Sequence, residues 1–426
     1  MSTELYKYQQ AIVDNQLTPQ TALFMDMGTG KTVTSLNVFK KFRTKRLLII
    51  CLISKMKDWQ YDVAKECNMA SIILDKGTTR NTKLLQKDYD AYIVNFESAW
   101  RLGSYLLKWV DKNTTVIIDE SHKIKNPTSK IGKFCSQLRN RTEHKIILTG
   151  TPQSQGYIDY YNQLHFLDML NYPFSEFKKL FCVYTQKVFN GFPVKQLTGY
   201  QNTHILDDLI HNRCVFYERK VDEEMIPTDI VQYFDKPKKY DPFKKDRIYE
   251  DVVADSIGKL FVSLRTLCSG NIEKYEVDNQ KIQWLDDLLD CMDERLVIFY
   301  NFNVERDRIS ELLTKKNIPF SEYSGRIKDF DTFKANEKSV ALCQFKSAST
   351  GINDLVISSK CVMFSLPLEY IDFVQARKRL DRIGQTKKPL FYYLICKGTV
   401  EEKIYRNLQE GKDFDEQMFE GYLRGE

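Results

Sequence analysis

The sequence lacks any long hydrophobic segment, which argues against a membrane-spanning protein. Its longest purely apolar run extends from Leu47 to Ile53, far short of the roughly 20 residues that a transmembrane helix needs. The first residues, MSTELYKYQQ, contain neither the basic nor the apolar region of a secretory signal. We therefore expect a cytoplasmic protein that has no membrane partner.

Clustered cysteines and low-complexity tracts are missing as well. The ten cysteines are scattered, with no C-x-x-C pair and no close histidine, so neither a zinc site nor a disulfide framework is expected. We expect reduced and mostly buried thiols. Apolar residues make up 42% and charged residues 28% of the chain, which is the balance of a globular protein.

A strong excess of either charge is also absent. The net charge of +6 has the sign expected of a nucleic-acid binder, but it is small for so long a chain. The densest basic stretch, KKFRTKR at residues 40–46, ends a predicted helix, where the helix dipole favours solvated cations. Charge alone therefore says little about function.

The sequence does contain a repeated pattern of short apolar runs separated by longer amphipathic stretches. This pattern is typical of parallel sheets covered by helices, and 426 residues suffice for two domains. The runs form two series, which predict two α/β lobes. They cover residues 21–27, 46–52, 71–74, 91–96, 115–120 and 145–150, and then residues 295–300, 339–345, 361–366 and 390–396.

The pattern changes between the two series. Apolar residues recur at helical spacing at Tyr160, Leu164, Leu167 and Leu170, which predicts a helical insertion. The polar segment 230–242 contains two prolines and three lysines and is predicted to lead from one lobe to the other. The predicted parts are lobe 1 (1–156), the helical insertion (157–229), a connection with a helical region (230–290) and lobe 2 with a C-terminal helix (291–426).

The segment MGTGKT, residues 27–32, lies between a predicted strand and a predicted helix, which is the context of a phosphate-binding loop. Its glycines would let backbone N–H groups approach phosphate oxygens, while Lys31 reaches the β- and γ-phosphates of ATP and the Thr32 hydroxyl binds Mg²⁺. Met25 stands where the strict motif has its first glycine, so a glycine turn that merely opens a helix is the alternative. The predicted nucleotide-binding residues here are Gly28, Thr29, Gly30, Lys31 and Thr32.

Two adjacent carboxylates end the strand predicted at residues 115–120. Asp119 is predicted to hold the Mg²⁺ of the nucleotide, and Glu120 to orient and deprotonate the attacking water. His122 is a candidate sensor of the γ-phosphate. An acidic strand end followed by a helix cap is the alternative. At the next strand end, in LTGTP, Thr149 and Thr151 are candidates for linking the nucleotide site to a nucleic-acid track.

The segment QARKRLDRIGQ, residues 375–385, carries two arginines three positions apart. We predict that Arg379 and Arg382 share one helix face and point across a cleft. There they would stabilise charge on the transferring phosphoryl group, an effect worth roughly 10³ to 10⁵ in rate. A solvated basic helix face is the alternative. Gln375 in this segment is a further candidate for coupling.

These four elements, in this order, resemble the motifs of helicase superfamily 2. Within it, IKN after the carboxylates and RIGQ after the arginines resemble the Swi/Snf-type ATPases. The resemblance implies an α/β fold of two RecA-like doubly wound parallel-sheet lobes with a helical insertion between them, in a compact version similar to prokaryotic or phage ones. Further matching segments are residues 5–9, 51–59, 148–155 and 349–354.

The resemblance also assigns roles to residues outside the four elements. By it, Gln9 reads adenine, and Gly351 and Asp354 lie near the nucleotide. Capping or solvated side chains are the alternative for the hydroxyl and amide groups that it places near the nucleic-acid backbone. Asp381 departs from the family pattern and is expected to restrain the neighbouring arginines by pairing. The residues placed at the nucleic-acid backbone are Ser54, Asn95, Ser347 and Thr350.

The function that this resemblance implies is an ATP- and Mg²⁺-dependent motor that acts as a monomer and moves along duplex DNA. Three alternatives stay open. A helicase that separates DNA strands would use the same residues together with a strand-splitting pin, and an RNA-directed motor would share the phosphate contacts. A non-catalytic clamp switched by nucleotide would bind DNA without turnover.

Overall fold

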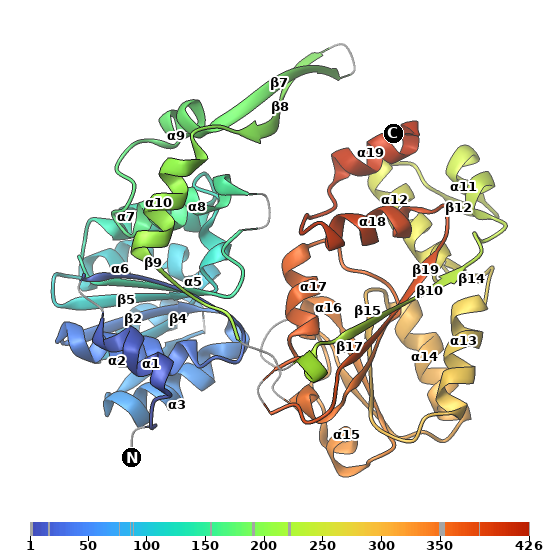
Figure 1. The fold of residues 1–426 in the computed structure, drawn as a ribbon, viewed down its shortest axis with the longest axis horizontal. Coiled ribbons are helices and arrows are strands. Elements are labelled where there is room, and N and C mark those ends of the chain that lie inside the picture. The colour runs from blue at the N-terminus through green and yellow to red at the C-terminus, as the bar shows by residue number, and fades with distance from the viewer. Residues whose placement is uncertain are drawn as a thin grey trace. The chain divides into compact units, whose positions relative to one another are not determined.

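The computed structural model describes residues 3–15, 18–75, 77–85, 87, 89–153, 156–189, 192–219, 223–348, 354–382 and 384–425. The chain divides into two units, Met1–Arg219 and Lys220–Glu426, each built around its own sheet (Figure 1). Over these described ranges, no helix combines the length and the apolar character needed to cross a membrane.

The first unit contains a seven-stranded sheet in which all neighbouring strands are parallel. Parallel neighbours require a crossover between them, and helices supply most of these connections. Every apolar run predicted in this part of the chain forms a strand. In spatial order the strands are β3 (Ser71–Leu74), β4 (Ala91–Asn95), β2 (Arg46–Cys51), β5 (Thr114–Asp119), β6 (Lys145–Thr149), β1 (Gln20–Met25) and β9 (Cys214–Tyr217).

Both faces of this sheet are buried, which explains why its strands are continuous apolar runs. In β2, Leu48 and Ile50 enter one core while Leu47 and Ile49 enter another. The first core is shared with α5 (Phe96–Arg101), α6 (Gly103–Trp109), α7 (Lys130–Arg139), α8 (Tyr160–Phe166), α9 (Phe174–Phe181) and α10 (Thr203–Arg213), and the second with α1 (Lys7–Asp14), α2 (Lys31–Phe42) and α3 (Met56–Cys67). The sheet is therefore doubly wound.

The region predicted as a helical insertion also contains strands. Besides α8 to α10 it forms an antiparallel hairpin of β7 (Cys182–Phe189) and β8 (Phe192–Tyr200), which extends away from the sheet in Figure 1. The sequence pattern did not reveal it because many of the described hairpin residues are exposed or only half-buried, with Val183 and Tyr184 38% and 37% exposed. The next strand, β9, joins the sheet beside β1.

The second unit contains a six-stranded sheet, again with all neighbours parallel. The predicted α/β class with two parallel sheets is thus confirmed. The segment predicted as the junction, 230–242, begins within a strand of this sheet. The two units divide earlier in the chain, after Arg219. The finer division at residues 156, 229 and 290 stays a prediction. The spatial order is β10 (Thr228–Phe234), β19 (Leu390–Cys396), β18 (Lys360–Met363), β15 (Leu296–Tyr300), β17 (Val340–Gln344) and β16 (Phe320–Tyr323).

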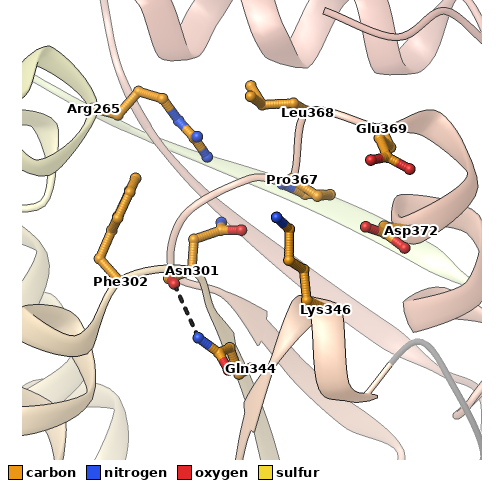
Figure 2. A pocket seen from close by; sticks show the side chains of 9 residues that line it. All are labelled: Arg265, Asn301, Phe302, Gln344, Lys346, Pro367, Leu368, Glu369 and Asp372. Atoms are coloured by element: carbon orange, nitrogen blue, oxygen red, sulfur yellow. Dashed lines mark hydrogen bonds between the residues drawn. The ribbon is translucent and has the colours of Figure 1, made fainter. Parts of the chain in front are cut away.

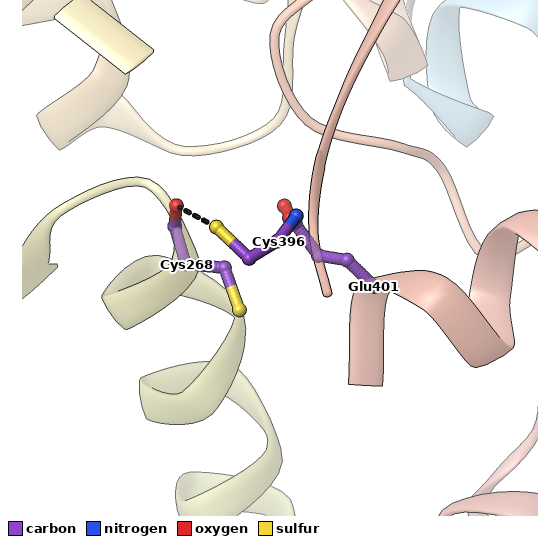
Figure 3. A group of neighbouring side chains, drawn as sticks. All are labelled: Cys268, Cys396 and Glu401. Carbon is purple, nitrogen blue, oxygen red and sulfur yellow. Dashed lines mark hydrogen bonds between the residues drawn. The ribbon is translucent and has the colours of Figure 1, made fainter. Parts of the chain in front are cut away.

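A buried ion pair joins two helices of the second unit. Lys281 of α13 (Gln280–Asp290) lies 2.7 Å from Glu401 of α18 (Val400–Gln409), and both side chains are nearly fully buried. The Glu401 carboxylate also accepts the backbone N–H of Cys396, and the Cys396 thiol donates to the carbonyl of Cys268 (Figure 3). The two thiols and the Glu401 carboxylate lie close enough to suggest a metal site, but the Lys281 ammonium already neutralises the carboxylate. We therefore regard the cluster as structural.

Replacing Lys281 with methionine should destabilise the second unit by about 3–5 kcal/mol, because it leaves the Glu401 carboxylate buried without a counterion. The rate at which the buried thiols of Cys268 and Cys396 are labelled under native conditions measures this loss of stability, because the thiols become accessible only when the unit opens. The double variant Lys281→Met with Glu401→Leu is the control and should recover much of the protection. Unchanged labelling rates in the single variant would contradict the structural role.

Candidate nucleotide site

The loop between β1 and α2 has the backbone of a phosphate-binding turn. Gly28 and Gly30 have φ angles of +77° and +74°, which are unfavourable for residues with a side chain. A Cβ atom at Gly30 would lie 2.3 Å from Nε2 of Gln9. The helix α2 begins directly after Gly30 and has no acidic residue in its first turn, so its free N–H groups and positive dipole end favour an anion.

Lys31 is folded back onto this loop. Its ammonium donates to the carbonyls of Met25, at 2.8 Å, and Asp26, at 3.1 Å. The Lys31 ammonium also lies beside Gly150, which directly follows β6. A Cβ atom built on Gly150 would be 3.6 Å from Nζ of Lys31. A triphosphate in the loop would offer this ammonium anionic oxygens in place of neutral carbonyls, and hydrogen bonds to charged groups are the stronger kind.

Gln9 lies against the same loop. Its Oε1 accepts the backbone N–H of Tyr6 at 2.9 Å, and its Nε2 donates to the carbonyl of Thr29 at 3.0 Å. The Tyr8 hydroxyl donates to the same carbonyl at 2.8 Å. The start of α1 is therefore fixed to the loop, while the reading of adenine by Gln9 stays a prediction.

Asp119 is the last residue of β5, whose end lies beside β6 in the sheet, and Glu120 follows it. Oδ2 of Asp119 accepts the indole N–H of Trp59 at 2.9 Å, and its Oδ1 accepts the backbone N–H of Glu120 at 3.0 Å. Burial and the neighbouring Glu120 charge raise the pKa of Asp119 to about 6, and the Trp59 hydrogen bond opposes that rise. Glu120 has a left-handed backbone with φ of +55°, a strained conformation that is typical of functional sites.

His122 connects the carboxylates to the end of β6. Its Nδ1 lies 3.4 Å from Oε2 of Glu120 and 3.2 Å from the hydroxyl of Thr149. Burial, with the nearby cations Lys123 and Lys125, lowers the pKa of His122 to about 3, so the ring is neutral at physiological pH. Nε2 of His122 is buried without a hydrogen-bond partner in the described structure. An atom in that state is available to a group that enters the site.

Thr149, which contacts His122, also forms a hydrogen bond with a residue of the following loop. Its hydroxyl accepts the backbone N–H of Thr151 at 3.1 Å, and the Thr151 hydroxyl is itself buried without a partner among the described residues. The predicted coupling residues of the first unit are therefore brought together. Their role in coupling stays a prediction.

Sequence reasoning missed a set of polar side chains, from the N-cap and the first turn of α8, that form hydrogen bonds or ion pairs with the loops after β5 and β6. The Gln163 amide accepts the hydroxyl of Ser121 at 2.7 Å and donates to the carbonyl of Pro152 at 2.7 Å. Asn162 donates to the carbonyl of Ile124, and Asp159 pairs with Lys125 at 3.3 Å. The available signal was a polar stripe, Asp159, Asn162 and Gln163, at helical spacing in an otherwise apolar segment.

The residues expected at the nucleic-acid backbone have mixed surroundings. Asn95 caps α5, where its Oδ1 accepts the N–H of Ser98 at 2.9 Å, and the Ser347 hydroxyl donates to Gln344 at 3.4 Å. The Ser54 hydroxyl is buried without a partner in the described part of the chain. Their contacts to nucleic acid stay predictions. Thr350 and Gly351 lie outside the described residues, and only the backbone of Asp354 is described, at the start of a short 3-10 helix.

The prediction that Arg379 and Arg382 share a helix face is wrong. The helix α17 (Tyr370–Arg377), in which Gln375 is buried, ends before either arginine. The N–H groups of Arg379 and Leu380 bond to carbonyls only three residues back, so the chain tightens into turns. Asp381 pairs with Lys378 at 3.4 Å. Arg379 is 4% exposed, and burial lowers the pKa of Arg382.

Comparison with known proteins identifies the family. A family profile described as "SNF2-related domain" matches residues 13–216, which span the phosphate loop, both carboxylates and the His122–Thr149 contact. The first unit is thus similar to the SNF2-related domain, and the similarity of nearly the whole chain to SWI/SNF- and CHD-named relatives supports a Swi/Snf-type assignment within helicase superfamily 2. The sequence resemblance is thereby confirmed at the level of the family.

Curated relatives of this chain include a SWI/SNF-related regulator of chromatin, subfamily A-like protein 1, from Drosophila melanogaster. It is 23% identical over 91% of this chain and 52% of its own length. The CHD3-type chromatin-remodeling factor CHR7 of Arabidopsis thaliana is 23% identical over 89% of this chain and 34% of its own. The chain thus spans about half the length, or less, of these relatives.

Among solved structures, a Sulfolobus solfataricus SWI2/SNF2 ATPase core in complex with dsDNA is similar to this chain. It is 21% identical with a TM-score of 0.45, and the match covers 95% of this chain and 91% of that one.

Proposed function

We propose that this chain hydrolyses ATP in the presence of Mg²⁺ and uses the energy to move along duplex DNA. The proposal is supported most by one observation, namely that a glycine loop, a lysine, a carboxylate pair and a neutral histidine gather at the carboxyl ends of β1, β5 and β6. Such strand ends are where open parallel sheets bind their ligands. The names of relatives, which include chromatin-remodelling proteins of the SWI/SNF and CHD kinds and a DNA repair and recombination protein, agree with DNA as the track.

In this proposal the loop N–H groups and Lys31 bind the triphosphate, and Thr32 and Asp119 hold its Mg²⁺. When bound there, Mg²⁺ would supply neutralisation of the charge that builds up on the phosphates. Glu120 orients and deprotonates the attacking water. Arg379 and Arg382, from the second unit, stabilise the transition-state charge.

The coupling of hydrolysis to movement is assigned to the contact chain from Glu120 through His122 and Thr149 to Thr151. When the γ-phosphate leaves, the surroundings of His122 change, and Gln163 transmits the change because it bonds both loops. Contacts to phosphates rather than bases make the movement indifferent to sequence. A monomeric state and a cytoplasmic location in a prokaryotic or phage-infected cell are further predictions.

The proposal is tested by measuring ATP turnover with single-stranded DNA, duplex DNA, branched DNA and RNA in parallel. We expect the largest stimulation with duplex DNA. Stimulation by RNA alone indicates an RNA-directed motor, and strand displacement in a separate assay indicates a helicase. Binding of DNA without any phosphate release identifies a nucleotide-switched clamp and contradicts the proposal.

Replacing Trp59 with phenylalanine should shift the acid limb of the pH profile of ATP turnover to higher pH. The raised pKa of Asp119, about 6, means that the ionised form needed for Mg²⁺ is lost as pH falls through this value. Removing the indole N–H removes a bond that stabilises the carboxylate, so this pKa rises further. Trp109→Phe is a matched control, because the Trp109 N–H is buried without an acceptor among the described residues. Coincident acid limbs in wild type and Trp59→Phe would refute this role.

A further inference from the structure

The hairpin of β7 and β8 projects from the first unit as a two-stranded ribbon (Figure 1). β7 contains 8 residues, so at about 3.3 Å per residue the ribbon is roughly 25 Å long. The hairpin is not part of the seven-stranded sheet, and an isolated two-stranded hairpin is only marginally stable in water. An arm of this length that adds little to the core of its unit points to a role outside folding.

The base of the hairpin is fixed to the rest of the first unit. Cys182 is 6% exposed, and the backbone N–H of Gln201 donates to the carbonyl of Phe181 at 2.9 Å. The ring of Tyr200 lies edge-on to that of Tyr157, with their centroids 5.4 Å apart. These contacts hold both strand ends, so the direction of the arm is set by its base.

Tyr200 also connects the arm to the chain that follows β6. A Cβ atom at Gly156 would lie 2.7 Å from Cε2 of Tyr200, and the Tyr200 hydroxyl accepts the backbone N–H of Ile158 at 3.5 Å. Gly156 comes shortly after Thr149 and Thr151 in the sequence, the residues proposed above to couple hydrolysis to movement. The arm is therefore attached next to the loop that would change with the state of the nucleotide.

The arm and its flanks have charge of one sign. Residues 177–206 contain four lysines and neither aspartate nor glutamate. The side chains of Lys179 and Lys195 are exposed, and no carboxylate in the described part of the chain forms an ion pair with either. Unpaired lysines on a projecting element attract an anionic partner.

Polar side chains accompany Lys195 on the described part of the ribbon. Gln186 lies opposite Lys195, and Thr185 lies opposite Gln196. Thr185 and Gln186 are exposed, and Gln196 is half-buried. Because directly opposite residues share a face of the ribbon, both faces carry amide or hydroxyl groups, which are among the groups that bond to DNA phosphates.

A pocket in the second unit has a different balance of charge. It has a volume of about 340 Å³. Burial lowers the pKa of Arg265 in its wall, and the carboxylates of Glu305 and Glu401 oppose that shift. The pocket therefore lacks the excess of positive charge that the arm has. The charged side chains of its lining are two cations and two carboxylates, namely Arg265, Lys346, Glu369 and Asp372 (Figure 2).

We infer that the β7–β8 hairpin contacts the phosphates of duplex DNA, with the ribbon lying along the major groove. That groove, about 12 Å wide, admits a two-stranded β-ribbon, and lysines that neutralise phosphates supply affinity without regard to sequence. The inference rests on the proposed function, which makes duplex DNA the partner. It adds a contact formed by an element separate from Ser54, Asn95, Ser347 and Thr350, the residues that the sequence places at the nucleic-acid backbone.

The test shortens the hairpin by replacing residues 186–195 with Asn-Gly, a two-residue turn that joins Thr185 to Gln196 and keeps the base. Affinity for duplex DNA is measured without nucleotide over a series of salt concentrations. The slope of log K against log salt should become shallower by about 2, because two lysines are removed, and by about 1 in Lys195→Gln. Lys112→Gln is the matched control and should keep the wild-type slope, since Lys112 is an exposed lysine of the same unit between α6 and β5.

The thermal unfolding transition shows whether the shortened chain is folded, and Lys195→Gln, a surface substitution, decides if it is not. Wild-type slopes in the hairpin variants overturn the inference, as a hairpin that binds a protein would give. A change of slope with single-stranded DNA or RNA but not with duplex DNA overturns it as well. If the unaltered chain has no affinity for duplex DNA, the proposed function itself fails, and that result is recognised before any variant is compared.

Discussion

Glu120→Gln is expected to abolish ATP turnover while ATP binding persists. The amide cannot accept a proton from the attacking water, and loss of a general base costs typically 10²- to 10⁴-fold in rate. The shape of the side chain is kept, so the 3.4 Å approach to His122 can be retained. Phosphate release under saturating ATP and DNA measures the loss.

Binding of Mg²⁺–ATP should survive this substitution for an electrostatic reason. The Glu120 charge is one of the causes that raise the pKa of Asp119. Removing that charge lowers the pKa of Asp119, so this carboxylate is more fully ionised at neutral pH and remains able to hold the metal. Equilibrium titration with ATP therefore serves as the internal check that the variant is folded and loaded.

Glu143→Gln is the matched control, because Glu143 is exposed in the same unit and has no assigned role. It should turn over ATP at the wild-type rate. If Glu120→Gln also does so, the assignment of the general base fails, and the proposed ATPase function fails with it.

Removing the Arg382 guanidinium is expected to reduce DNA-stimulated hydrolysis by roughly 10³- to 10⁵-fold, the range observed for arginines that stabilise phosphoryl transfer. Arg382→Ala deletes the group, and Arg382→Lys keeps a charge but loses the planar fork. Both variants should bind ATP and DNA as the wild type does. Single-turnover kinetics at saturating DNA separates the chemical step from binding.

Arg379 requires more caution in design because it is 4% exposed, and Arg379→Ala therefore needs a check of its unfolding transition. Arg406→Gln is the control, since Arg406 is an exposed arginine of the same unit paired only with Glu402 one helical turn away among the described residues. Wild-type hydrolysis in Arg382→Ala would refute the arginine assignment and leave that of Glu120 intact.

The central strands could be predicted because both their faces are buried, which makes them continuous apolar runs such as residues 46–52. Of the edge strands, β3 could be predicted from its apolar run at residues 71–74, but β9, β10 and β16 could not. β10 and β16 each have only one neighbour in the sheet, and their burial alternates or is partial, as in Phe320–Tyr323. Edge strands tolerate polar residues, so short mixed segments such as these resemble loops in the sequence.

The candidate site shows a similar division. Lys31, Asp119 and Glu120 belong to short local motifs, and the spacing of residues within these motifs was enough to predict their roles at a nucleotide site. Trp59 and Gln163 act through hydrogen bonds to residues 60 and 42 positions away in the chain. A local sequence pattern cannot predict a contact between residues so far apart in the chain. These hydrogen-bond partners could therefore be identified only from the folded structure.

The position of β1 in its sheet has a consequence for how the protein is made. This strand, which leads into the phosphate loop, pairs with β6 at Lys145 and with β9 at Cys214. A ribosome releases the N-terminus first, so a nascent chain exposes this loop long before either neighbour has been synthesised. Capacity to capture a nucleotide should therefore arise late in translation, when nearly the whole first unit has left the exit tunnel.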